Sequence, residues 1–116
     1  MLADAHRQAA EENEQLIADA GDPAIKPYAG RGIIELYWGA AFHWIAFGCQ
    51  QKHGKHKENH SHLVSFLRDM GELTNSNTWD ALDKARNGGW YGHHNSLIDV
   101  QETQQYWQEI RTWALT

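Results

Sequence analysis

Residues 32–52, GIIELYWGAAFHWIAFGCQQK, contain the most apolar part of the chain. Apolar side chains recur there every three or four positions, which predicts a helix with a wide apolar stripe. The stripe consists of Ile33, Tyr37, Ala40, Trp44 and Phe47, flanked by Ile34, Ala41 and Ile45. A stripe of this width predicts a central helix. Gly39 and Gly48 lower the helix propensity, but they allow another helix to approach closely.

Upstream of this segment, residues 2–20 predict a first helix that ends at Gly21. Its thin apolar stripe consists of Ala5, Ala9, Leu16 and Ala20. The connector at residues 21–32 contains two prolines and three glycines, which forbid regular structure across it.

Downstream, the polar turn HGKHKENHSH, residues 53–62, leads into a third helix that ends at Gly71. Its apolar face consists of Leu63, Phe66, Leu67 and Met70. A short helix follows, with an N-cap among Asn75 to Thr78 and a stop at Gly88-Gly89. Its helically spaced residues are Trp79, Leu82 and Arg86.

The last helix begins near Asp99, and one of its faces consists of Val100, Thr103, Trp107, Ile110 and Ala114. No strand-like alternation extends beyond a few residues, so we expect an all-α, antiparallel up-and-down bundle of four main helices plus a short one. With 116 residues, of which 41% are apolar, the chain predicts one globular domain, residues 1–116.

The chain has six tryptophans, an unusual number for its length. Trp38, Trp44, Trp107 and Trp113 recur at helical spacing, so we interpret them as core and interface residues. This surplus of aromatic side chains over what one small core can bury favours a symmetric dimer.

The formal net charge of −5 gives no global attraction to nucleic acid, so a phosphate site must be a local positive patch. The single cysteine, Cys49, cannot form an internal disulfide, and we interpret it as a small buried residue. The N-terminal stretch is acidic where a secretion signal is apolar, and Glu35 and His43 interrupt the most apolar segment. We therefore expect a cytoplasmic protein without a membrane span.

The stretch KARNGGWYGHH, residues 84–94, contains Arg86, a polar neighbour Asn87, and His93 after six intervening residues. Here the chain resembles the HEPN family, small helical bundles with an arginine, a polar residue and a histidine at this spacing. Two upstream stretches are similar to family motifs in the same order. ELYWGAAFHWIAFG resembles the "YYAAFH" helix, and KENHSHLVSFL resembles "KTHSGLI", with His60 or His62 at its histidine.

The resemblance implies a metal-independent endoribonuclease of the toxin or defence type, active as a homodimer, with Arg86, Asn87 and His93 as its catalytic residues. It also implies RNA as substrate, no cofactor, and an antitoxin partner such as a nucleotidyltransferase-type protein. Cleavage would leave a 2′,3′-cyclic phosphate and a 5′-hydroxyl. Trp90 and Tyr91 are placed to stack on a base, and His94 is a helper or a bystander.

Two other interpretations of this motif are open. Arg86 can cap its helix end and pair with Asp83, while His93 and His94 lie in a solvated loop. The same bundle can also be a non-catalytic module that binds a nucleotide or a partner protein.

Residues 53–62 invite a metal-site interpretation through four histidines, namely His53, His56, His60 and His62. HKENH is not the HExxH motif, because Glu58 is in the wrong position, and we favour a polar turn that binds no metal.

Lysines make the same region the densest basic patch in the chain, formed by Lys52, Lys55 and Lys57. This patch can bind an RNA backbone or can simply be solvated. His43, on the apolar face of its helix, is interpreted as a core or interface histidine.

Overall fold

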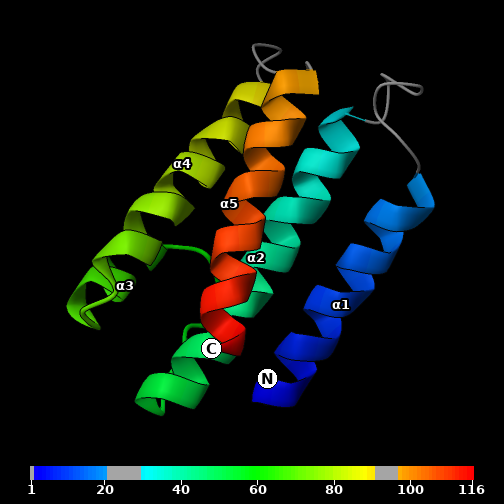
Figure 1. Ribbon diagram of the computed structural model, residues 1–116. Coiled ribbons are helices and arrows are strands. Elements are labelled where there is room, and N and C mark those ends of the chain that lie inside the picture. Colours follow the sequence, from blue (N-terminus) through cyan, green and yellow to red (C-terminus); the bar gives the residue numbers. More distant parts are fainter. Residues whose placement is uncertain (1, 21–29, 91–96) are drawn as a thin grey trace.

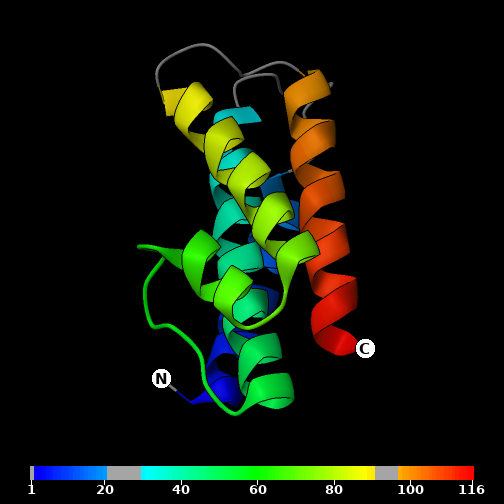
Figure 2. The ribbon, with the colours of Figure 1, turned by 90° about the vertical axis from the view of Figure 1, so that its left-hand side faces the viewer.

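The computed structural model describes residues 2–20, 30–90 and 97–116, which form an all-α helical bundle (Figure 1). Its helices are α1 (Ala3–Ala20), α2 (Gly30–His53), α3 (Leu63–Asp69), α4 (Leu73–Trp90) and α5 (Leu97–Leu115). The four long helices alternate in direction along the chain, and Figure 2 shows the short α3 beside the first turns of α4. The predicted fold class is confirmed.

The bundle has a terminal end and a distal end. At the terminal end, α1 begins and α2 and α5 finish; at the distal end, α2 and α5 begin and α4 finishes (Figure 1). Most of the predicted connector, residues 21–29, lies outside the described residues.

Helix α2 is the central element, as its wide apolar stripe predicts, and it packs against α1, α4 and α5. Its buried apolar side chains are Ile33, Ile34, Tyr37, Ala40, Ala41, Trp44, Ile45, Ala46, Phe47 and Cys49. None of the described helices, α2 included, has a stretch apolar enough and long enough to cross a lipid bilayer.

Five of the six tryptophan side chains are described, and all five belong to the core of a single chain. Trp44 and Trp79 are buried, whereas Trp38, Trp107 and Trp113 are half-buried and pack against the core. The prediction that tryptophans are core residues is confirmed. Because one chain accommodates them, the aromatic surplus gives no separate support for a dimer.

The buried face of α1 differs from the predicted stripe. His6 and Ala10 are buried there, while Leu16 is 53% exposed. Glu14 and Ile17 follow His6 and Ala10 at helical spacing and also face the bundle, where Ile17 packs against the core. Of the predicted stripe, Ala20 packs against the core, whereas Leu16 was wrongly placed, because a histidine and a glutamate lie on the inner face.

Glu14 explains this orientation of α1. The indole Nε1 atoms of Trp44, on α2, and Trp107, on α5, each donate a hydrogen bond of 2.8 Å to Oε2 of Glu14. Arg111 Nε lies 3.3 Å from the same oxygen, and the Glu14 side chain is only 18% exposed. The Glu14 carboxylate therefore joins α1 to both α2 and α5. A rotation of α1 that buried Leu16 would move this carboxylate away from the two indoles.

Replacing Glu14 with alanine should lower the free energy of unfolding by about 3 kcal/mol, because two largely buried N–H donors lose their acceptor at about 1–3 kcal/mol each. Urea denaturation measures this change. The control Glu12→Ala alters an exposed residue of the same helix and should change the free energy by less than about 0.5 kcal/mol. Equal effects of the two substitutions would contradict the role assigned to Glu14.

Gly48 and Gly39 permit close helix contacts, as expected from the sequence. A Cβ at Gly48 would overlap the ring of Trp113, on α5, and would lie 2.8 Å from its Cη2 atom. A Cβ at Gly39 would lie 2.7 Å from Nδ2 of Asn13, on α1, the end of a side chain that can move aside.

A series of Gly→Ala variants of α2 should therefore diverge. Gly48→Ala should destabilise the protein by about 1–3 kcal/mol, because a packed aromatic ring must shift. Gly32→Ala, where a Cβ meets nothing within 4 Å, should stabilise it by about 0.5–1 kcal/mol through helix propensity. Gly39→Ala should fall between them. Thermal unfolding can rank the three variants, and a stabilising Gly48→Ala would contradict the contact.

Helix α3 has the predicted extent, whereas α4 is longer than predicted. Gly71 follows the end of α3 as expected, with a φ of +81°, and α3 has 7 residues, but α4, predicted to be the short helix, has 18. Helix α4 begins at Leu73, before the predicted N-caps. Ser76 instead donates its hydroxyl to the carbonyl of Val64 in α3, at 2.8 Å. Helix α4 therefore includes Asn75 to Thr78, the polar residues predicted to cap it, because the helix packs against α3 there.

The other end of α4 also differs, because the helix continues through Gly88-Gly89 to Trp90. Each glycine lowers helix propensity by only about 1 kcal/mol, a cost that the contacts of α4 with α2 and α5 can offset. Helix α5 begins at Leu97, two residues before Asp99, and α2 extends slightly beyond its predicted range.

Candidate functional site

Arg86 lies near the distal end of the bundle, where α4 faces α2. Its Nε atom donates to both carboxylate oxygens of Glu35, at 3.1 and 3.0 Å, and its guanidinium carbon lies 4.1 Å from the ring centroid of Trp38. Glu35 and Trp38 are three residues apart on α2 and therefore share a face. Glu35 thus holds the guanidinium at its Nε edge, and Trp38 packs on its face. The Arg86 side chain is 24% exposed.

The alternative interpretation that pairs Arg86 with Asp83 does not match the structure. Asp83 instead accepts a hydrogen bond of 3.0 Å from Nε1 of Trp38. The indole ring therefore engages both residues of α4, its N–H with Asp83 and its face with Arg86, and the ion pair of Arg86 is with Glu35.

His60 contacts the same tryptophan. Its ring centroid lies 5.0 Å from that of Trp38, with the two planes at 70°. The segment that joins α2 to α3, residues 54–62, therefore returns from the terminal end of the bundle to the ring that supports Arg86 (Figure 2).

The remaining residues of the predicted motif are only partly described. Asn87 is exposed on α4 beside Arg86, and Trp90 is the last residue of that helix, with its side chain outside the described set. Tyr91, His93 and His94 lie within residues 91–96, also outside it. The structure thus gives the position of Arg86, and the role of His93 stays a prediction.

Within the predicted basic patch, Lys52 lies away from Arg86. Lys52 is in the last turn of α2, with Nζ 5.5 Å from the ring centroid of Trp113, whereas the Arg86 partner Glu35 is near the start of that helix. At 1.5 Å per residue, the 17 positions from Glu35 to Lys52 span about 25 Å along the helix. Lys55 is exposed, and Lys57 donates to the carbonyl of Ser61.

The four histidines of residues 53–62 do not converge. His53 Nε2 lies 2.9 Å from Oε1 of Glu72, His60 packs on Trp38, and His62 is exposed at the start of α3. Only His56 contributes to a group of possible metal ligands among the described residues. The four-histidine metal site considered from the sequence is therefore excluded as a group.

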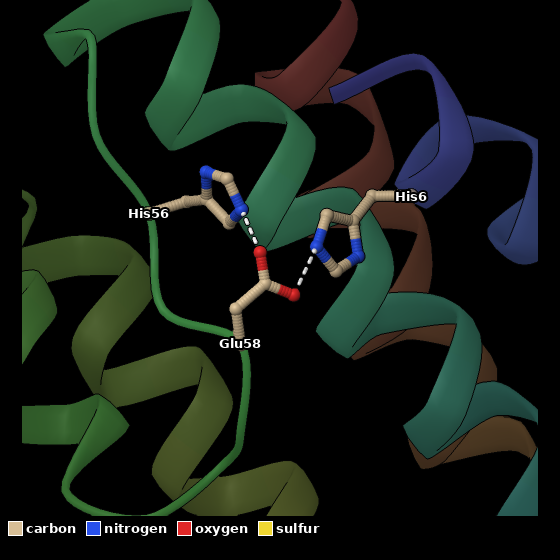
Figure 3. Close-up of side chains that lie close together, drawn as sticks. All are labelled: His6, His56 and Glu58. Carbon is tan, nitrogen blue, oxygen red and sulfur yellow. Dashed lines mark hydrogen bonds and ion pairs between the residues drawn. The ribbon is translucent and has the colours of Figure 1, made fainter. Parts of the chain in front are cut away.

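His56 instead belongs to a cluster with His6 and Glu58, which we term the His/Glu cluster (Figure 3). Nε2 of His56 lies 2.6 Å from Oε1 of Glu58, and Nε2 of His6 lies 3.2 Å from Oε2. Figure 3 shows the carboxylate between the two imidazole rings. His6 comes from α1, and the other two residues from the segment 54–62.

Each imidazole of the cluster has a further polar contact on its other nitrogen. Nδ1 of His6 lies 2.9 Å from Nδ1 of His43, on α2, and Nδ1 of His56 lies 2.8 Å from Oε1 of Gln50, also on α2. His43 is thus a half-buried histidine with a polar partner, as the sequence predicted. Helix α2 orients both rings with their Nε2 atoms toward Glu58.

Burial keeps both members of the His6–His43 pair neutral at neutral pH. It lowers the pKa of His6, which is 1% exposed, below the ordinary value, and the Glu58 carboxylate opposes the shift only in part. Burial, with a contribution from His6, also lowers the pKa of His43. Because the unfolded chain then takes up protons at a higher pH than the folded chain, protonation favours unfolding.

Stability should therefore be complete above about pH 6.5 and should decrease as the pH falls toward the lowered pKa values, by up to about 1.4 kcal/mol per pH unit for each histidine. Urea denaturation over this range, with chelator present, measures the slope. His43→Gln should reduce this slope. A comparison of the variant with wild type at about pH 8, where His43 is neutral, measures the loss of packing separately from the effect of titration. An unchanged slope would contradict the coupling.

Cys49 takes no part in either candidate site. It is fully buried in α2, and burial, with a smaller effect of Glu72, raises the pKa of its thiol to about 12. An uncharged thiol is a poor nucleophile and a poor metal ligand, so the sequence-based interpretation of Cys49 as a core residue is confirmed.

Sequence reasoning missed His6, Glu35 and the role of Glu58. One signal for His6 was present, because His6, Ala10 and Glu14 repeat every four residues and mark one face of α1. No local signal pairs His6 with His56, since 50 residues separate them. No protein-family model, curated protein or solved structure matches the chain significantly.

Proposed function

We propose that the protein is a metal-independent endoribonuclease with a catalytic site formed by Arg86, Asn87 and His93, in which Arg86 binds the scissile phosphate. The observation that carries the proposal is the fixed position of the Arg86 guanidinium, held by Glu35 and Trp38 in the last turns of α4. The motif that resembles the HEPN family continues from this point into residues 91–96.

The chemistry requires few groups. RNA supplies its own nucleophile, the 2′-hydroxyl, so the enzyme must transfer protons and stabilise charge on the phosphate oxygens. A histidine such as His93 transfers protons near neutral pH. An arginine stays charged and offers a planar set of donors to phosphate, and Glu35 engages Arg86 through Nε, one of five N–H donors.

Preorganisation supports a phosphate-binding role for Arg86. A free arginine loses side-chain entropy when it binds phosphate, whereas the contacts with Glu35 and Trp38 have already restricted this one. In this proposal Asn87 orients His93 or donates to the phosphate, Trp90 and Tyr91 stack on a base, and His94 assists.

The wider arrangement follows from the same resemblance. Two copies of the chain would place their motifs together across a homodimer interface, and a nucleotidyltransferase-type antitoxin would be the natural inhibitor. Lys52, Lys55 and Lys57 would contribute affinity for the RNA backbone, Lys52 at a distance from the reacting phosphate.

The Glu35 ion pair favours a second candidate function. A carboxylate that contacts Arg86 at 3.0 Å offsets part of its positive charge, as in an arginine whose role is to join two helices. In that case the bundle is a non-catalytic module that binds a nucleotide or a partner protein. The two candidates differ in whether RNA is cut.

Incubation of purified protein with total RNA, with chelator present, separates them. The wild-type protein should produce fragments with 2′,3′-cyclic phosphate ends. Arg86→Lys keeps the charge but loses the planar donor set, and it should slow cleavage by about 100-fold or more. His93→Ala should have a similar effect, as expected for a positioned acid–base group, and His94→Ala a much smaller one.

The matched control is Arg68→Lys, which alters an exposed arginine on α3 and should leave the rate unchanged. Thermal unfolding of each variant establishes that it is folded at the assay temperature. Absence of cleavage by the wild-type protein, or an undiminished rate for folded Arg86→Lys, would reject the nuclease and leave the binding module.

A further inference from the structure

We propose that His6, His56 and Glu58 form a binding site for a divalent zinc ion that fastens the segment 54–62 to α1. Within residues 2–20, 30–90 and 97–116, no other group of three or more His, Cys, Asp or Glu side chains brings its ligand atoms within 4.8 Å of one another. The site is separate from Arg86 and does not depend on the proposed nuclease activity.

One ligand atom from each of the three residues lies within 4.8 Å of the other two. Two ligands bound to zinc at about 2.0–2.1 Å in tetrahedral geometry lie about 3.3 Å apart. The distance from His6 Nε2 to Glu58 Oε2 is 3.2 Å, and that from His56 Nε2 to Oε1 is 2.6 Å. The two imidazoles contact different oxygens of Glu58, so binding of one ion requires the carboxylate to shift and to move away from His56 by a few tenths of an ångström. Glu58 and His56 both belong to a segment between helices, which permits this shift.

Both imidazoles have the hydrogen-bond partners that metal-binding histidines commonly use. A histidine that binds metal through one nitrogen usually donates its other N–H to a fixed acceptor. Gln50 Oε1 lies 2.8 Å from Nδ1 of His56, and Nδ1 of His43 lies 2.9 Å from Nδ1 of His6. In the metal-bound form, His6 would donate its Nδ1 proton to His43 and direct the Nε2 lone pair at the ion.

The surroundings of His56 allow a cation at Nε2. Its two nitrogens both face oxygen acceptors, Gln50 Oε1 on one side and Glu58 Oε1 on the other. A neutral imidazole has a single N–H and can satisfy only one of them. A metal ion at Nε2, with the single N–H at Nδ1 donated to Gln50, satisfies both; so does a turned Gln50 amide, which would donate to Nδ1.

The ligand types favour zinc over other abundant divalent ions. Magnesium and calcium prefer oxygen ligands, whereas two imidazole nitrogens and one carboxylate suit zinc. Three protein ligands also leave one coordination position for water.

Solvent reaches the cluster from two directions. The Glu58 side chain is 49% exposed. A surface hollow of about 420 Å³ adjoins His56 and is lined by Leu2, Ala3, Asp4, Gln50, Gln51 and His56. An ion can therefore enter without unfolding of the bundle.

Bound zinc would restrict the movement of the segment 54–62 relative to α1. This segment links α2 to α3 and contacts Trp38 through His60. A metal held by His56 and Glu58 on one side and by His6 on the other would tie the segment to α1, so the bound ion should raise the midpoint of thermal unfolding.

Calorimetric titration of the full chain, free of affinity tags and stripped with chelator, tests the site with Zn²⁺ alone. We expect one equivalent per chain and a higher unfolding temperature. His56→Ala and Glu58→Gln should each weaken binding by at least about 100-fold, and Gln50→Ala, which only positions His56, by about 10-fold. The matched control is His62→Ala, which removes an exposed histidine of the same region and should change the affinity by less than about twofold.

Co²⁺ in place of Zn²⁺ gives a second readout, since its visible absorption reports coordination geometry even if a variant is less stable. We expect a tetrahedral spectrum for wild type and His62→Ala, and none for His56→Ala. The proposal is overturned if wild type shows no saturable binding, or if folded His56→Ala binds zinc like wild type. A nuclease assay with chelator is independent of these outcomes, so either proposal can fail alone.

Discussion

A single carboxylate oxygen, Oε2 of Glu14, accepts hydrogen bonds from the indoles of Trp44 and Trp107, and much of the bundle depends on this arrangement. An indole N–H can only donate, so two tryptophans can point into the same interior only where an acceptor meets them. Helix α1 supplies that acceptor to α2 and α5. The requirement sets both the rotation and the axial position of α1 against its neighbours.

The position of α1 in turn creates the His/Glu cluster. His6 lies eight residues before Glu14 on the same helical face, about 12 Å along the axis. With Glu14 fixed beneath the two indoles, His6 reaches His43 on α2 and Glu58 in the segment 54–62. The inner face of α1 thus carries two polar residues: Glu14 joins three helices in the middle of the bundle, and His6 belongs to the His/Glu cluster at its terminal end.

Trp38 has a corresponding role toward the distal end. Its ring packs on Trp79 in the core, while Arg86 lies over it and His60 contacts it at 5.0 Å. A half-exposed ion pair such as Arg86–Glu35 contributes at most about 1 kcal/mol to stability. Its larger effect is to hold a guanidinium in one orientation, which is what recognition of a phosphate requires.

Helix α2 connects the Arg86 region to the His/Glu cluster and sets the distance between them. Glu35 and Trp38 lie in its first half, and Gln50 and Lys52 in its last turns. A long rigid helix separates the Arg86 region from the His/Glu cluster by several turns, so the two sites can act independently. The segment 54–62 nevertheless touches both, through His60 and His56, and zinc at one site would restrain a residue beside the other.

The amino-acid pattern was sufficient for the helical class, the central place of α2, the close contacts of Gly39 and Gly48, the end of α3 at Gly71 and the burial of Cys49. These features depend on the 3.6-residue period and on glycine geometry, which are local properties of the chain. The partners of Arg86 and His56 and the inner face of α1 were decided by contacts between residues up to about a hundred positions apart, such as Glu14 with Trp107. The length of α4 likewise followed from its packing against α2, α3 and α5. Such contacts depend on how helices rotate and slide against one another, and that arrangement exists only once the bundle has formed.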